Sequence, residues 1–169
     1  IKRLGYTDPE LNFTHESPIT VLVHQQSPEI AVGVKKKGAG DQGMMFGYAC
    51  NETPELMPLP IALSHALTKR LDEVREKKIL NYLKPDGKSQ VTVLYENGKP
   101  TDITHIVMAA PHQKSVDIEK VKKDIFKHVI TPVFKTYGFK PKIENFVLNG
   151  TGVWHFSGPA ADTGVTGRK

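Results

Sequence analysis

Two spacings of apolar residues divide the chain into short strands and two longer helices. Alternation or short apolar runs predict strands at residues 18–24, 44–50, 89–95, 103–109, 143–148 and 153–156. Apolar residues at spacings of three and four predict helices at residues 60–78 and 116–130. Between residues 44 and 148 the predicted order is therefore strand, helix, strand, strand, helix, strand.

This β-α-β-β-α-β order is typical of an α+β fold, a two-layer sheet-and-helix domain. Two helices then cover one face of a single sheet. The strands hold apolar side chains to share between both faces, among them Val93, Tyr95 and Val107, so the other face is also expected to be apolar in part. We expect that face to be buried against a further part of the assembly, which predicts an oligomer.

Proline, asparagine and glycine mark the expected ends of these elements. Asn97-Gly98 predicts the turn of a hairpin, within a connection at residues 96–102 that we expect to exceed two residues because it holds Pro100. Pro28 is expected to end the first strand, and residues 31–37 are expected to form a loop. Pro132 is expected to end or kink the second helix, and Ser115 or Asp117 to cap it.

Composition indicates a globular protein with a real core. The chain has 169 residues, of which 38% are hydrophobic, and no apolar run approaches the roughly 18 residues of a membrane helix. We expect a cytoplasmic protein with no membrane partner. The single Cys50 excludes an internal disulfide and is expected in the core. Neither Ile1 nor the glycine-rich end resembles a natural terminus, so we expect a fragment.

The net charge of +5 permits an anionic partner without selecting one. Three consecutive lysines at residues 35–37 form either a solvated loop or a cationic lid. The lysines of the second helix alternate with Glu119 and Asp124 and have no aromatic neighbours, so we expect them to aid solubility rather than bind nucleic acid. His65 is expected at the surface, and His112 is a candidate for a ligand contact.

Three glycine-containing turns each hold a carboxylate. Asp41 lies in Gly38-Ala39-Gly40-Asp41-Gln42-Gly43, Asp86 in Pro85-Asp86-Gly87-Lys88, and Asp162 in the segment from Gly158 to Thr166-Gly167-Arg168-Lys169. Such turns bring backbone close to a small ligand. A cation beside each of the last two carboxylates suits a ligand with phosphates and a hydroxyl or amine. Trp154 either stacks on a base or fills the core.

These sequence motifs resemble those of the S-adenosylmethionine synthetase family. The matching segments are Gln26-Ser27-Pro28-Glu29-Ile30, residues 38–60, Pro85-Asp86-Gly87-Lys88-Ser89-Gln90-Val91 and residues 158–169. They follow the family order along essentially the whole chain. Members are more than twice as long and contain three similar α+β repeats. The resemblance implies the end of the N-terminal domain with its gating loop at 1–37, the central domain at 38–157 and the start of the C-terminal domain at 158–169.

The family makes S-adenosylmethionine from ATP and L-methionine. The methionine sulfur attacks C5′ of ATP, and the displaced triphosphate is hydrolysed to phosphate and pyrophosphate. The resemblance implies the cofactors Mg²⁺ and K⁺, and a homodimer or homotetramer with active sites between subunits.

The resemblance also implies roles for individual residues. Methionine is expected at Gln26, Asp41 and Asp162. ATP is expected at Asp86, Gly87, Lys88, Trp154, Asp162, Arg168 and Lys169. Of these, the residues expected to take part in catalysis are Lys88, Asp162, Arg168 and Lys169. No metal ligand is assigned.

The chain departs from the family pattern in three respects. The gating loop at Ser27–Lys37 is several residues shorter than in most members. Val153-Trp154 stands where an Arg-Phe pair is usual, which removes one cationic contact. The family's first and last catalytic segments are absent, so we expect this chain alone to be inactive. A non-catalytic dimerising domain and a basic nucleic-acid-binding domain remain as alternative interpretations.

Overall fold

The computed structural model describes residues 1–164, and the chain divides into two compact units. The first unit consists of residues 1–16 together with the chain from residue 49 onward. The second unit is Ser17–Tyr48. Each is described by itself.

The first unit is built on a sheet of three strands. These are β1 (Lys88–Glu96), β2 (Lys99–Ala109) and β3 (Phe146–Leu148), in the spatial order β1-β2-β3. β1 and β2 run antiparallel, whereas β3 runs parallel to β2. A parallel neighbour requires a long crossover, and the helices between β2 and β3 supply it.

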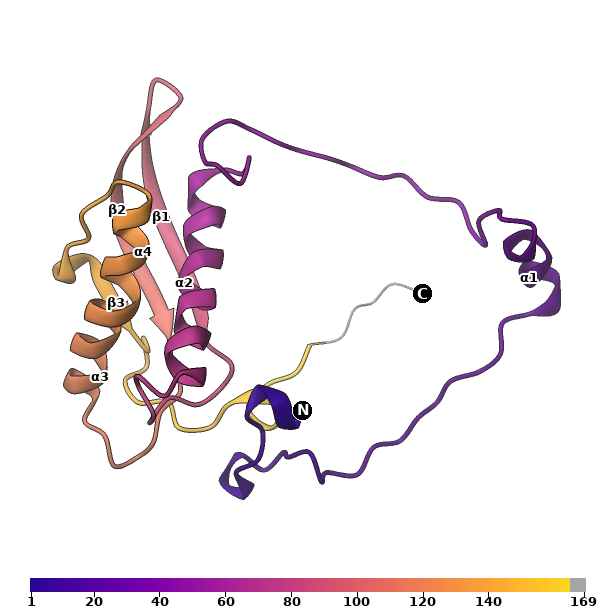
Figure 1. Cartoon of the computed structure of the whole chain (residues 1–169), viewed down its shortest axis with the longest axis horizontal. Coiled ribbons are helices and arrows are strands. Elements are labelled where there is room, and N and C mark those ends of the chain that lie inside the picture. The colour runs from indigo at the N-terminus through magenta and orange to yellow at the C-terminus, as the bar shows by residue number, and fades with distance from the viewer. Residues whose placement is uncertain (165–169) are drawn as a thin grey trace. The chain divides into compact units, whose positions relative to one another are not determined.

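Helices cover one face of this sheet (Figure 1). α2 spans Leu59–Glu76, α3 spans Ile118–Ile125 and α4 spans Thr131–Thr136. Their apolar stripes meet the inward side chains of the strands in one core, which includes Leu63, Leu67, Ile106, Met108, Ile125, Phe134 and Phe146. On the other face Leu94 and Val147 are exposed. Tyr95 lies on the helix-covered side of β1, in line with Val91 and Val93, and its hydroxyl donates to Glu52. The predicted α+β two-layer arrangement is confirmed.

The hairpin is tighter than the sequence predicted. The connection is the two-residue turn Asn97-Gly98, and both residues have positive φ, at 52° and 75°. That geometry matches the twist of the flanking strands, which explains the Asn-Gly pair. Pro100 therefore lies inside β2, opposite Tyr95, where the register shifts between Leu94 and Tyr95 absorb it.

The second predicted helix continues past Pro132 rather than ending there. α3 begins after Asp117, whose Oδ1 accepts hydrogen bonds from the backbone N–H groups of Glu119 and Lys120, as a helix cap does. A wider π-helical turn at Phe126–Ile130 then precedes α4. In a π-helical turn each backbone N–H bonds to the carbonyl five residues earlier, one residue further back than in an α-helix. The carbonyl that the ring of Pro132 approaches is therefore a different one from that in a regular α-helix. Pro132 thus sits in the first turn of α4.

Of two further strand predictions, one is partly wrong and the other is wrong. Only Phe146–Leu148 of the expected strand at 143–148 pairs as β3, because Ile143–Asn145 forms a 3₁₀ turn. The segment 153–156 forms no strand, and instead the carbonyl of Trp154 accepts a hydrogen bond from the N–H of His112 at 3.0 Å. Further 3₁₀ turns of the same length lie at Lys2–Leu4, Pro9–Leu11 and Gly158–Ala160.

The second unit differs most from the prediction. Its only helix within the described residues is α1 (Pro28–Lys35), so Pro28 begins a helix rather than ending a strand, and most of the expected loop at 31–37 is helical. Proline is well suited to a first helical position, which the interpretation of Pro28 overlooked.

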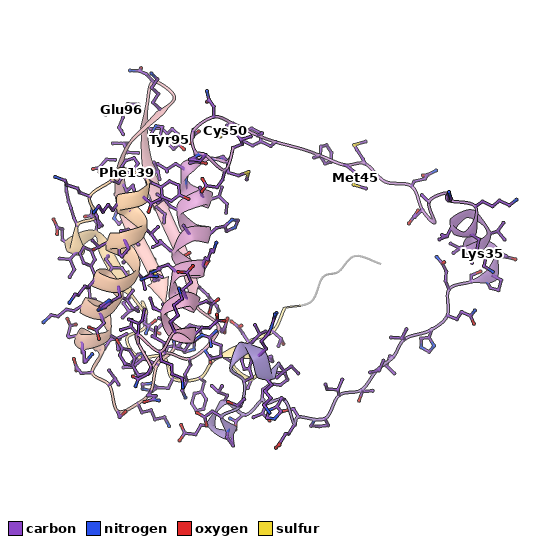
Figure 2. All side chains as sticks on the ribbon, viewed as in Figure 1. Lys35, Met45, Cys50, Tyr95, Glu96 and Phe139 are labelled. Carbon is purple, nitrogen blue, oxygen red and sulfur yellow. The ribbon has the colours of Figure 1, made fainter. Side chains whose placement is uncertain are left out.

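The strands expected at 18–24 and 44–50 are absent from the described structure. Both segments are extended but unpaired, and Val23 and Phe46 are 84% and 91% exposed. Met45 lies on such an extended stretch in Figure 2. An alternating pattern marks a segment suited to a sheet, but a strand also requires a hydrogen-bonded neighbour.

The sequence also predicted the environments of Cys50 and His65. Cys50 is partly exposed rather than in the core, and its N–H donates to the carbonyl of Leu56. His65 is exposed on α2, as predicted. No helix among residues 1–164 is long and apolar enough to span a bilayer.

Candidate functional site

The candidate site lies where β1 begins. Lys88 is its first residue, and Asp86 stands two residues earlier in a left-handed conformation with φ of 80°. Left-handed backbone is tolerated best by glycine, asparagine and aspartate. The chain passes through Pro85-Asp86-Gly87 without reversing, from the bridge of Leu83 with His112 to the pairing of Lys88 with Ala109. The Lys88 side chain reaches a loop far along the sequence.

That loop carries Asp162. Its Oδ2 lies 3.1 Å from Nζ of Lys88, across 74 residues of sequence. The two side chains are 72% and 51% exposed. An exposed ion pair contributes about 0–1 kcal/mol. Either group is therefore free to exchange its partner for a charged ligand at little cost.

A hollow of about 440 Å³ surrounds this pair. It is lined by Lys88, Ala109, Thr151, Trp154, Ala161 and Asp162. Nζ of Lys88 lies 5.3 Å from the centroid of the Trp154 ring, within range of a cation–π contact. Trp154 is half-buried, so it belongs to the wall of the hollow and not to the core. We call this space the Lys88 hollow.

Asp86 and Gly87, predicted as ATP contacts, make protein contacts here. Oδ2 of Asp86 accepts a hydrogen bond from the backbone N–H of Gly158 at 2.9 Å. A Cβ on Gly87 would lie 2.2 Å from Cδ2 of Leu71, so this glycine allows β1 to approach α2. Of the predicted triplet, Lys88 is the residue whose side chain lines the hollow.

Thr151 and Trp154 form one wall of the hollow. Thr151 was not predicted as a site residue, and Trp154 was predicted either to stack on a base or to fill the core. Asn149 holds this stretch: its Oδ1 accepts from the N–H of Ala110 at 2.8 Å, and its Nδ2 donates to the same residue's carbonyl at 3.2 Å. Residues 149–152 lie between two of the predicted strands, and no site residue is predicted among them. A polar, glycine-rich turn directly after a strand is the signal that pointed here.

His112 lies behind the hollow instead of in it. Its side chain is fully buried, its Nδ1 lies 3.1 Å from the carbonyl of Ala110, and its ring meets that of His155 edge-on at 5.1 Å. The structure thus gives His112 a packing position rather than the ligand contact proposed from the sequence.

Gln26 and Asp41 belong to the second unit. A Cβ on Gly40 would lie 3.4 Å from Nε2 of Gln26, so Gln26 borders the glycine-rich turn that carries Asp41. Oδ1 of Asp41 accepts a hydrogen bond from the N–H of Gln42 at 2.7 Å, and its side chain is exposed. Two of the three predicted methionine contacts are thus neighbours within the second unit.

The predicted pair Arg168 and Lys169 lies outside the described residues. Within residues 1–164, no group of three His, Cys, Asp or Glu side chains is arranged to hold a metal ion. Asp162 is paired with Lys88, and Oδ2 of Asp86 is taken by Gly158. The described residues therefore do not fit a metal site by themselves.

Comparison with known proteins places the chain in a family. A family model for the central domain of S-adenosylmethionine synthetase matches residues 36–154. The S-adenosylmethionine synthases of Sulfurovum sp. (strain NBC37-1) and Desulfosudis oleivorans are 44% and 45% identical to it over alignments that cover all of this chain and 45% of each relative. That of Pseudothermotoga lettingae is 45% identical, over 98% of this chain and 46% of the relative.

This chain spans about half the length of the curated relatives it matches. The alignments run over 174, 177 and 184 positions, more than the 169 residues of the chain, so the chain lacks some residues that its relatives have. The family model covers most of the sequence, including the whole of β1 and β2. The chain therefore belongs to the S-adenosylmethionine synthetase family.

Proposed function

We propose that this chain is the middle part of an enzyme that makes S-adenosylmethionine from ATP and methionine. On this proposal residues 1–37 end an N-terminal domain, 38–157 form the central domain and 158–169 begin a C-terminal domain. The family membership and the 42–45% identity to proteins named S-adenosylmethionine synthase support the proposal.

The observation that carries it is the Lys88–Asp162 pair beside Trp154. In the reaction a neutral thioether becomes a sulfonium cation while an anionic triphosphate leaves. A site that lowers this barrier needs anionic groups near the sulfur and cationic groups near the phosphates. The Lys88 hollow offers one group of each sign, next to an aromatic face suited to a base.

The proposed roles follow from charge. Lys88 binds the phosphates, and Asp162 binds the hydroxyl or ammonium groups of ATP and methionine. Arg168 and Lys169 add cations for the triphosphate. Gln26 and Asp41 hold methionine from the second unit. No residue acts as a covalent nucleophile, because the sulfur attacks C5′ directly once it is aligned with the leaving oxygen.

The proposal includes Mg²⁺ and K⁺, on the family resemblance alone. Bound to a triphosphate, a divalent cation neutralises charge on the leaving group. Since residues 1–164 form no metal site by themselves, we assign no ligand in this chain and derive no step through either ion.

We also propose that the enzyme is a homodimer or homotetramer. The exposed face of the sheet, which presents Leu94 and Val147, supports this because an apolar sheet face needs cover. Active sites between subunits would then combine residues from two copies of the full-length protein.

A thermal-shift experiment tests the proposed function against the alternatives. The protein of the relatives' full length is melted with ATP, with its non-hydrolysable imido analogue, with methionine and with a DNA duplex. A nucleotide site predicts a rise with ATP and the analogue, by the mass action of ligand on the folded state. A purely structural domain responds to none of them, and a nucleic-acid-binding domain responds to the duplex in a strongly salt-dependent way. Either of those two results would refute the proposal.

A further inference from the structure

The loop at residues 158–162 is held at its first residue, four positions before the carboxylate that meets Lys88. Gly158 is buried, with φ of 77°, and its N–H donates to Oδ2 of Asp86. The carbonyl of Gly158 accepts from the N–H of Ala161 at 2.9 Å and, more weakly, from that of Asp162 at 3.4 Å. The position of Asp162 is therefore tied to Gly158 by one short turn.

Tyr6 closes the other side of Gly158. A Cβ built on Gly158 would lie 2.3 Å from Cε1 and 2.9 Å from the hydroxyl of Tyr6. Tyr6 is half-buried, and its pKa is raised by burial and then by the negative charge of Asp86. The ring and the carboxylate thus enclose the same glycine.

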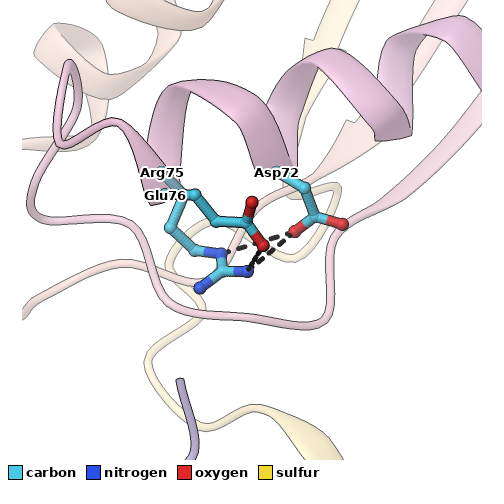
Figure 3. Close-up of polar contacts among 3 residues, drawn as sticks. All are labelled: Asp72, Arg75 and Glu76. Atoms are coloured by element: carbon cyan, nitrogen blue, oxygen red, sulfur yellow. Dashed lines mark hydrogen bonds and ion pairs between the residues drawn. The ribbon is translucent and has the colours of Figure 1, made fainter. Parts of the chain in front are cut away.

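Tyr6 is in turn supported by α2. A Cβ on Gly5 would lie 2.8 Å from Nη1 of Arg75, so the guanidinium packs against the backbone just before Tyr6. Figure 3 shows what holds that guanidinium: Asp72 and Glu76 on the same helix accept from its Nη2 at 3.2 and 3.5 Å. Only 13% of the Arg75 side chain is exposed.

We infer that Asp86 is a positioning residue, which fixes the 158–162 loop through Gly158 and so sets Asp162 against Lys88. Asp86 and Lys88 stand two residues apart at the start of β1, and Gly158 and Asp162 stand at the two ends of the loop. Two contacts between the same pair of segments fix the loop better than either alone. This inference rests on the proposed function for its kinetic consequence, but its structural part does not.

The proposed role of Asp86 depends on its acceptor oxygen and not on its charge. Asparagine keeps an acceptor for the Gly158 N–H and tolerates left-handed backbone, but it carries no charge. Glycine accepts the backbone conformation and removes the acceptor. Asp86→Asn should therefore hold the loop, and Asp86→Gly should release it without adding backbone strain.

The first test uses the 169-residue chain without ligand, because Trp154 is its single tryptophan and lines the Lys88 hollow. Acrylamide quenching of Trp154 should increase in Asp86→Gly and stay near the wild-type value in Asp86→Asn. Lys78→Gly is the matched control, since Lys78 also has positive φ, at 56°, but lies on the surface after α2. It should leave the quenching unchanged. Circular dichroism confirms that each variant is folded.

The second test uses the full-length protein and separates positioning from direct binding. Asp86→Gly should raise the KM for ATP about tenfold, the loss expected for one well-placed hydrogen bond, and Asp86→Asn should lose much less. In an Asp162→Asn background, Asp86→Gly should cost little more, because residues that act through one another are not additive.

Three results would overturn the inference: unchanged Trp154 quenching in Asp86→Gly, equal losses in Asp86→Asn and Asp86→Gly, or additive effects with Asp162→Asn. If Asp86→Gly does not fold, Gly158→Ala releases the loop from the other side, by collision with Tyr6, and should raise the quenching likewise. A wild-type protein without an ATP response would refute the proposed function, while the quenching experiment would still decide the role of Asp86.

Discussion

At the scale of single residues, the site depends on positions where the backbone must come close to a neighbour. Gly87 is the clearest case, because Cδ2 of Leu71 occupies the place that a Cβ would take. The glycine contributes space rather than a chemical group. Its neighbour Lys88 contributes the charge, so adjacent residues of one turn have different functions.

Gly87→Ala should destabilise the protein by about 1–3 kcal/mol, because the added methyl group overpacks the contact between β1 and α2. The measurement is the denaturation midpoint in urea. Gly150→Ala is the control, since no atom lies within 4 Å of the Cβ it would add.

Truncation of Leu71, the residue that a Cβ on Gly87 would meet, provides the decisive comparison. In a Leu71→Ala background the new methyl group has room, so Gly87→Ala should then cost little or even stabilise. An equal loss in both backgrounds would refute the steric explanation.

Ionisation of Tyr82 gives a residue-scale prediction for alkaline pH. Its hydroxyl donates to Oδ2 of Asp124 at 2.7 Å. Burial, this hydrogen bond and the charge of Asp124 all raise the pKa of Tyr82 well above its usual value. Because the folded-state pKa exceeds that of the unfolded chain, the stabilisation is complete below about pH 10 and is lost as pH rises toward the folded-state value.

The melting temperature should thus fall as pH rises above about 10, and it should fall less steeply in Tyr82→Phe, which cannot ionise. At neutral pH the variant loses the hydrogen bond and is less stable by about 1 kcal/mol. Identical pH profiles for the two proteins would contradict this account.

At the scale of elements, β2 and the turn after β3 are joined by one side chain. Asn149 is buried and satisfies both the N–H and the carbonyl of Ala110, the residue after β2. The turn that carries Thr151 and Trp154 begins at this anchor. The geometry of the Lys88 hollow therefore depends on a residue that does not line it.

Asn149→Gly should cost about 1–3 kcal/mol of unfolding free energy, because it leaves the buried N–H of Ala110 without its acceptor. Glycine keeps the positive φ of 45° without strain, so the loss reports the side chain. Asn97→Gly is the control, since Asn97 has φ of 52° in the exposed hairpin turn, and it should change the urea midpoint little. Equal losses in the two variants would contradict this role of Asn149.

Some of these elements could be predicted from the sequence, and others could not. The stripe of α2 and the Asn97-Gly98 turn were predictable because each is a local pattern with a local cause. The segments 18–24 and 44–50 were wrongly predicted as strands, because alternation reports a suitable face but not the presence of a neighbour. Pro28 was misread because the same residue suits the end of one element and the start of another.

The candidate site was predictable only in part. The three turns were recognisable from glycine and carboxylate, and the resemblance assigned their roles. Nothing local in the sequence reveals that Asp162 meets Lys88, or that Asp86 bonds to Gly158, since 74 and 72 residues separate these pairs. Such contacts depend on the folded path of the chain.

At the scale of the whole molecule, the account requires more than this chain. Its relatives are about twice as long, and two of the residues proposed to hold methionine, Gln26 and Asp41, belong to the second unit. The 169-residue chain alone should form no S-adenosylmethionine from ATP and methionine, whereas the full-length protein should. Product analysis by chromatography checks this, and turnover by the 169-residue chain alone would contradict the prediction.

The central claim is that Lys88 and Asp162 act on the two substrates. The most direct test is the rate of S-adenosylmethionine formation by the full-length protein carrying Lys88→Ala or Asp162→Asn. Loss of one group that stabilises developing charge costs on the order of 10²–10³ in kcat, so we predict at least a hundredfold loss in each, with the melting temperature retained. Wild-type turnover in both variants would contradict the account.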